Sequence, residues 1–305
     1  MTLANTQPDT ISRPRVIYIA GYGRSGSTVL DTAMSKTWVG VESGGELSLQ
    51  LDAFSRPTTH CSCGRQVSDC TFWQPLYTNT LNGNQSQTAF SRHESRPSHV
   101  FGRRINQSSK SWVDWNTRLL RSLSPDGGLH QENWVVDSSK TARKAAFRPD
   151  LLEADLGVEI FIVHLVRSPK SVLLSLAKGL NRDLEVGTQT RPRSRLRTIT
   201  SWVVANAHAY RLSHKLGEQR VRRIEYEQLV ADPETTLLEI GAWLRLEEDK
   251  ERIDVATPHI VTGNRSRFNS PQISRRSSNS WTRTDRALDH AARLLGFAAN
   301  AVFGG

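Results

Sequence analysis

The sequence predicts an α/β fold in which a central parallel β-sheet is flanked by helices. Short apolar stretches alternate along the chain with longer stretches of helical periodicity, which is typical of such sheets. In addition, a polar cluster directly follows several of the apolar stretches, and parallel sheets bind ligands beyond the C-terminal ends of their strands. The first cluster is G-Y-G-R-S-G-S-T-V-L at residues 21–30.

The first predicted strand covers residues 15–20 and follows Pro14. We expect residues 1–13 to form a disordered lead-in. After the glycine-containing loop, a helix of about 9 residues is predicted from Thr28, because its apolar residues recur at helical spacing. A strand, a Gly-rich turn and a helix in this order direct backbone amides and a positive helix end toward an anion.

Two further strand and helix pairs are predicted in the middle of the chain. Trp134-Val135-Val136 is expected to form the second strand, followed by D-S-S-K and a helix near 141–154. Residues 158–166 are so apolar that they indicate a central strand covered on both faces. The next helix is expected to begin near Pro169, since proline suits the first position of a helix.

The remaining predicted elements are helices at 198–216 and 233–244 with a strand at 221–224 between them. We expect residues 14–305 to form a single domain. Polar, Arg-containing insertions are expected near 78–111 and 181–197, and a further lid-like segment at 264–286. Each of these segments could also be a solvated loop.

The composition is strongly basic, with a formal net charge of +10 and 32 Arg among 40 Lys and Arg residues. A high share of Arg suits contact with planar oxyanions, although a base-composition bias of the source genome explains the total equally well. The most apolar stretch, 158–166, is interrupted by Glu159 and His164 and is too short to span a membrane. The first residues show no secretory signal pattern, so we expect a cytoplasmic protein.

The loop at residues 21–28 fits the phosphate-loop pattern G-x-x-x-x-G-K-[ST] everywhere except at the Lys, where Ser27 stands. Its backbone amides could surround a phosphate, Thr28 could add a hydroxyl, and Arg24 brings a permanent charge. An inert Gly-Ser turn is the alternative interpretation. Arg167 at a strand end and Ser175 on the helix that follows could bind a second phosphate. Two neighbouring phosphate-binding sites imply a ligand that is phosphorylated at two places.

These two motifs together resemble the sulfotransferases that use 3′-phosphoadenosine 5′-phosphosulfate (PAPS) as donor, and in particular the bacterial members. The resemblance implies a P-loop-NTPase-like fold and transfer without a metal. In that family the first loop holds the 5′-phosphosulfate, which here corresponds to Arg24, Ser25, Gly26, Ser27 and Thr28. Arg167 and Ser175 match the residues that hold the 3′-phosphate.

Two later stretches extend the resemblance to roughly residues 15–285. R-I-E-Y-E-Q-L at 223–229, followed by Asp232-Pro233, is similar to the family's R-Y-E-D-L…D-P stretch. G-N-R-S-R-F at 263–268 is similar to its late donor-binding loop. The further donor-binding residues that this implies are Tyr226, Gly263, Asn264, Arg265 and Arg267.

The catalytic residues follow from the same resemblance. Glu46, in G-G-E, matches the glutamate that is the base in the Golgi and bacterial branches, although a solvated surface role is the alternative. Lys140 is placed like the family's lysine that reaches the bridging oxygen, and with Arg24 it would stabilise the leaving group. His93 and His99 are fallback candidates for the base, whereas His164 is interpreted as a core residue.

The cysteines form an unusual cluster in sequence. Four possible zinc ligands, His60, Cys61, Cys63 and Cys70, fall within 11 residues, but their spacing is not that of a standard structural site. C-x-C-G…C-x-F-W is similar to a pattern in bacterial sulfotransferases and suggests a local structural role. We therefore expect no metal.

Two other functions remain as alternatives. A P-loop kinase or NTPase is favoured only by the phosphate loop, and a non-enzymatic polyanion or nucleic-acid binding protein only by charge. Aromatic residues are sparse in the Arg-rich segments, so few side chains could stack on nucleic-acid bases. We therefore expect no nucleic-acid partner. The expected acceptor is a hydroxyl, or less readily an amine, of a small molecule, glycan or lipid. The sequence specifies neither the acceptor nor the oligomeric state.

Overall fold

The structure is a computed structural model, and most of the chain has a described conformation. The described residues are 14–56, 58–81, 87–96, 107–124, 133–142, 144–177, 194–248, 258–268, 273 and 281–303. The expected lead-in at 1–13, and residues 181–193 of the second insertion, lie outside them.

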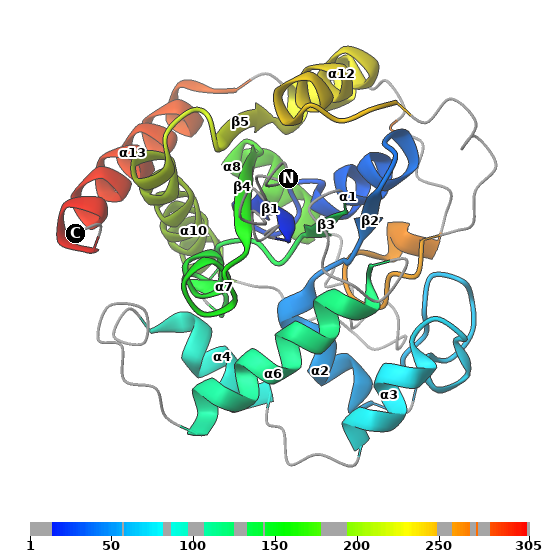
Figure 1. Cartoon of the computed structure of the whole chain (residues 1–305). Coiled ribbons are helices and arrows are strands. Elements are labelled where there is room, and N and C mark those ends of the chain that lie inside the picture. The colour runs from blue at the N-terminus through cyan, green and yellow to red at the C-terminus, as the bar shows by residue number, and fades with distance from the viewer. Residues whose placement is uncertain are drawn as a thin grey trace, which may run out of the picture.

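A five-stranded parallel sheet forms the centre of the molecule, with the strand order β2-β3-β1-β4-β5 (Figure 1). Its strands are β1 (Arg15–Ala20), β2 (Val41–Ser43), β3 (Trp134–Asp137), β4 (Glu159–Val166) and β5 (Val221–Glu225). Because all pairs are parallel, all five C-terminal strand ends lie at one edge of the sheet. The predicted α/β fold with a central parallel sheet is thus confirmed.

The central strand β1 is apolar on both faces. Val16, Tyr18 and Ala20 belong to one buried cluster, whereas Ile17 and Ile19 belong to another. This alternation follows from the period of two in a β-strand, which sends successive side chains to opposite faces. The sheet is therefore covered by a hydrophobic layer on each side.

Helices form these two layers. On the Ile17 face lie helices α1 (Ser27–Thr37), α11 (Tyr226–Ala231) and α12 (Pro233–Leu244). The cluster on the Val16 face draws residues from α2 (Gln50–Phe54), α3 (Gln74–Leu81), α4 (Gln87–Ser95), α6 (Gln107–Ser122), α7 (Arg148–Leu156) and α10 (Arg195–Leu216). Outside them, α13 (Arg283–Phe303) runs beside α10, and α8 (Pro169–Ala177) follows β4 (Figure 1).

One element differs from the sequence-based expectations. The helix expected near 141–154 begins only at Arg148, because Lys140 takes a left-handed backbone conformation with φ 68° and Pro149 favours a helix start. In the insertion expected near 78–111, the described parts are largely helical, and Phe90 and His93 of α4 are buried.

A buried charge network joins α4 to the sheet. Arg148 donates from Nε to Asp137 at 2.7 Å and from Nη1 to Glu94 at 2.5 Å. Trp112 Nε1 donates to the same Glu94 oxygen at 2.9 Å. All three charged side chains are almost fully buried, so loss of Arg148 would leave two carboxylates without their counter-charge.

We therefore predict that Arg148→Met lowers the free energy of unfolding by about 3–5 kcal/mol. Urea unfolding monitored by circular dichroism measures this loss. The matched control is Arg222→Met, because Arg222 makes an exposed ion pair with Glu239 at 3.4 Å. That change should lower the free energy by less than about 1 kcal/mol, and equal losses in both variants would contradict the prediction.

Candidate functional site

Each of the five parallel strands delivers one predicted site residue at its C-terminal end. Arg24 follows β1, Glu46 follows β2, Lys140 follows β3, Arg167 follows β4 and Tyr226 follows β5. The order of the strands reverses around β1, and the crevice above such a position is where open α/β sheets bind ligands. The sheet therefore gathers residues from across the chain at one place.

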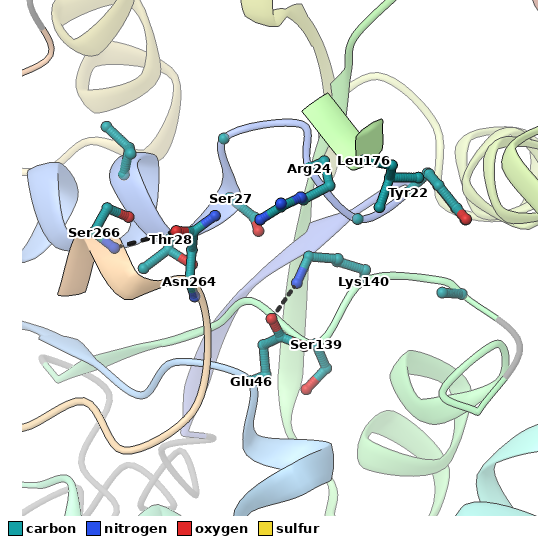
Figure 2. Close-up of a pocket in the computed structure, with 14 residues that line it drawn as sticks. Tyr22, Arg24, Ser27, Thr28, Glu46, Ser139, Lys140, Leu176, Asn264 and Ser266 are labelled. Atoms are coloured by element: carbon teal, nitrogen blue, oxygen red, sulfur yellow. Dashed lines mark hydrogen bonds and ion pairs between the residues drawn. The ribbon is translucent and has the colours of Figure 1, made fainter. Parts of the chain in front are cut away.

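A pocket of about 280 Å³ lies at this edge (Figure 2). The predicted site residues that line it are Arg24, Gly26, Ser27, Thr28, Glu46, Lys140 and Asn264. The sequence did not identify Tyr22, Val29, Leu176 or Ser266, which also line it. Ser25, Arg167, Ser175, Tyr226, Gly263, Arg265 and Arg267 are not among its lining residues.

The phosphate loop ends in an open helix start. Gly26 is the N-cap of α1 with φ 88°, and as a glycine it has no side chain that could cap the first turn. The first amides of a helix have no partner within the helix and can bind an anion, which the positive end of the helix also favours. Glycine is required at this position, because a Cβ atom on Gly26 would lie 2.4 Å from Tyr226 Cε2.

Two arginines lie next to the loop. Arg167 Nη1 donates to the backbone carbonyl of Arg24 at 2.9 Å, and its guanidinium lies 4.3 Å from the centre of the Tyr226 ring. Arg24 Nη2 donates to the backbone carbonyl of Ser175 at 3.3 Å. Burial lowers the pKa of Arg24, and the positive charge of Arg167 lowers it further. An anion bound between the two guanidinium groups would relieve this repulsion.

Glu46 and Lys140 form an ion pair inside the pocket, with Oε1 and Nζ 2.6 Å apart (Figure 2). The hydroxyl of buried Tyr18 donates to the backbone carbonyl of Lys140 at 2.6 Å and so holds its left-handed turn. Thr262 Oγ1 donates to the backbone carbonyl of Glu46 at 2.9 Å. Strained residues persist where the surrounding structure over-determines them, and such residues cluster at active sites.

The predicted late loop reaches the phosphate loop through its backbone. The Asn264 amide donates to Thr28 Oγ1 at 3.0 Å, and a Cβ atom on Gly263 would lie 3.0 Å from the same oxygen. Arg267 is buried, and its Nη1 donates to the carbonyls of Gly263 and Asn264 at 3.4 Å. In this structure Arg267 thus braces the loop, while Arg265 is exposed.

The fallback histidines lie elsewhere. His93 is buried, and its Nε2 lies 3.9 Å from Asp155. His164 is buried in β4, where its Nε2 is 2.9 Å from Asn206 Oδ1, and burial lowers its pKa to about 4. His99 lies outside the described residues. Among the described residues that line the pocket, Glu46 is therefore the one carboxylate, and no histidine is present.

Comparison with known proteins identifies the family of this chain. The sequence profile of the sulfotransferase family matches residues 14–250. The chain belongs to the sulfotransferase family. No curated protein sequence matches this sulfotransferase. Among the described residues, no helix has both the length and the apolar character needed to cross a membrane.

Solved structures of sulfotransferases are similar to this chain at low sequence identity. A sulfotransferase domain from the curacin biosynthetic pathway is similar with a TM-score of 0.54 and 18% identity, over 91% of this chain and 96% of that one. The sulfotransferase domain of the Synechococcus PCC 7002 olefin synthase has a TM-score of 0.47 and 19% identity, over 96% and 97%. The first of these similarities supports the fold alone.

Sequence reasoning missed one buried residue that shapes this sulfotransferase site. Asp31 on α1 accepts hydrogen bonds from Ser43 Oγ at 2.5 Å and from the Gly45 amide at 3.1 Å. It thereby fixes the turn that presents Glu46. Burial raises the pKa of Asp31 to about 7, although these hydrogen bonds oppose the rise. The one signal in the sequence is a carboxylate next to the apolar face of a helix.

Asp31 should make stability depend on pH. The pKa of Asp31 is about 7 in the folded chain against 3.8 normally, so the folded state loses stability as pH rises from about 4 to 7. Asp31→Asn removes this titration. Between pH 5 and pH 8 the wild type should lose about 2–3 kcal/mol relative to the variant, measured by urea unfolding at both values. A difference between the two proteins that does not change with pH would contradict the prediction.

Proposed function

We propose that this sulfotransferase moves a sulfuryl group from PAPS to a hydroxyl group of an acceptor. The observation that carries the proposal is the Glu46–Lys140 pair, 2.6 Å apart in the pocket that the phosphate loop also lines. Transfer needs a base for the acceptor and a positive charge for the leaving group. This pocket offers both within the reach of one bound donor.

The donor is held by two groups of residues in this proposal. The 5′-phosphosulfate lies against the amides at the start of α1, together with Thr28 and Arg24. The 3′-phosphate is held by Arg167 and Ser175 beside the loop. The close approach of Arg167 to the Arg24 backbone supports one ligand with two anionic groups.

The chemical step is an in-line displacement at sulfur. The acceptor oxygen attacks the sulfur atom while the bond from sulfur to the bridging phosphate oxygen breaks, and its electron pair stays on that oxygen. Glu46 accepts the proton of the acceptor hydroxyl. Lys140 and Arg24 stabilise the negative charge that develops on the leaving phosphate.

The lack of a lysine in the loop supports a donor other than a nucleoside triphosphate. In phosphate-loop NTPases this lysine reaches the β- and γ-phosphates, and here Ser27 lines the pocket at that position. PAPS has no γ-phosphate. Arg24, which takes a left-handed conformation with φ 69°, supplies a charge from within the loop instead.

The acceptor enters beside Tyr22 and Leu176 in this proposal. Both side chains line the pocket, as does Arg24 (Figure 2). They offer apolar surface next to the reacting groups, which suits an acceptor that is a small molecule, a glycan or a lipid with a partly apolar body. A cytoplasmic location stays a prediction.

Donor binding is tested with the reaction product 3′,5′-adenosine bisphosphate. We expect isothermal calorimetry to show binding to the wild type and at least about tenfold weaker binding to Arg167→Ala, since a charge-assisted contact is lost. Arg222→Ala removes an exposed arginine from β5 and should leave the affinity unchanged. Failure of the wild type to bind this nucleotide at low ionic strength would contradict the proposed donor.

Catalysis is tested with PAPS labelled in its sulfuryl group, incubated with cell extract so that the labelled acceptor can be isolated. Glu46→Gln should reduce transfer by about 10²–10⁴-fold while nucleotide affinity stays unchanged, because only the base is lost. Glu239→Gln, on an exposed side chain, is the control. Full activity of Glu46→Gln would place the base elsewhere, and Mg²⁺-dependent ATP turnover without sulfuryl transfer would favour a kinase or NTPase.

A further inference from the structure

Three cysteines and one histidine meet at a place that the proposed reaction does not use. The Sγ atoms of Cys61, Cys63 and Cys70 and one ring nitrogen of His259 all lie within 4.8 Å of one another. We propose that these four residues bind one zinc ion, which joins the segment at 61–73 to the segment at 258–264. The sequence favoured no metal here, because the spacing of the cysteines and His60 is not that of a standard structural site. His259, 198 residues beyond Cys61, gives no local signal in the sequence.

Three of the six distances between the ligand atoms are close to those of a tetrahedral zinc site. With Zn–S near 2.3 Å and Zn–N near 2.0–2.1 Å, ligand atoms at the corners of a tetrahedron are about 3.6–3.8 Å apart. Cys63 and Cys70 have their sulfurs 3.8 Å apart, and Cys61 Sγ lies 3.6 Å from His259 Nδ1. Cys70 Sγ lies 3.3 Å from the same nitrogen. An ion could therefore enter with only small movements of the side chains.

The ligand types also favour zinc. Three thiolates and one neutral imidazole form a Cys₃His set, which is one of the common structural zinc sites. Binding releases the three thiol protons to solvent and leaves a complex with a net charge of −1. All four positions are taken by protein ligands, so the site is closed and structural rather than catalytic. Without a metal, three free cysteines would be packed together in and beside the core.

The surrounding structure orients the ligands. Cys61 lies in a tight turn in which the Gly64 amide donates to its carbonyl at 2.9 Å. The ring of His259 stacks on Phe72 with a centroid distance of 4.9 Å and an angle of 2°. Trp73 Nε1 donates to the His259 carbonyl at 2.6 Å. These contacts fix the imidazole in its orientation, as the groups around a metal ligand commonly do.

The proposed ion sits at one end of a strap, residues 258–264, that reaches the active site. Near the cysteines, the Ser62 amide donates to the Ile260 carbonyl at 2.8 Å. Further along, Thr262 holds the backbone of Glu46, and Asn264 holds Thr28. The zinc would therefore act as a positioning element for both the base and the phosphate loop. This coupling to the active site rests on the proposed function, whereas zinc binding itself does not.

Metal content tests the site directly. The full chain, purified without added metal or chelator, is expected to contain about one zinc per chain by mass spectrometry. His259→Gln should lose most of it. His60→Gln is the matched control, because His60 is an exposed histidine next to Cys61 that is outside the cluster, and it should retain the zinc. Cobalt exchanged into the wild type should give the intense visible absorption of a tetrahedral cobalt–thiolate complex.

Other outcomes overturn the proposal. A folded wild type without zinc that shows three free thiols with a thiol reagent would do so, as would a Cys63–Cys70 disulfide found by mass spectrometry. If His259→Gln does not fold, the zinc content of Cys63→Ser, which should be low, and the cobalt spectrum of the wild type still test whether the cluster binds a metal. His259→Gln should also bind 3′,5′-adenosine bisphosphate at least about tenfold more weakly. A zinc-containing wild type that binds no nucleotide would contradict the proposed function and leave the metal site intact.

Discussion

The parallel direction of all five strands is the constraint on which the site depends. All five strands end at the same edge of the sheet, so the residues that follow them gather there, and Arg24, Glu46 and Lys140, which follow β1, β2 and β3, line a common pocket. Residues as far apart in sequence as Gly26 and Tyr226 become neighbours in this way. The apolar layers on both faces hold the strands in place, so the turns that carry these residues begin at fixed positions.

Buried polar groups hold the turns at this edge in conformations that the backbone alone would not favour. Tyr18, from the middle of the sheet, binds the Lys140 carbonyl, and Asp31, from the first helix, binds the turn before Glu46. Asp137 does the same for the start of the turn after β3, since it accepts from the Ser139 amide at 3.0 Å. Glu46, the proposed base, and Lys140 are thus positioned by groups outside the pocket, which is how precise sites are generally built.

The sequence predicted the parts of this architecture that are encoded locally. The apolar runs at 15–20 and 158–166 gave strands at nearly those residues, because central strands need continuous apolar sequence. The edge strand β2 escaped detection because three residues are too few to show a pattern. The start of α7 was placed too early because a left-handed turn at Lys140 depends on Tyr18, a contact 122 residues away in sequence.

His259 was missed for the same reason, as its partners are distant along the chain. For Arg267 the motif match identified the residue. It could not show whether the side chain contacts a ligand or, as in this structure, the backbone of its own loop.

The pocket depends on the strap at 258–264 as well as on the sheet. The family profile ends at residue 250, and the complete sheet lies before that point. Yet Asn264 and Ser266 line the pocket, and Thr262 holds the backbone of Glu46, which lines it as well. Substitutions in the strap would therefore act on the pocket although they lie beyond the residues that the family profile matches. Divergence among relatives in this stretch should change the shape of the pocket even where every strand-end residue is kept.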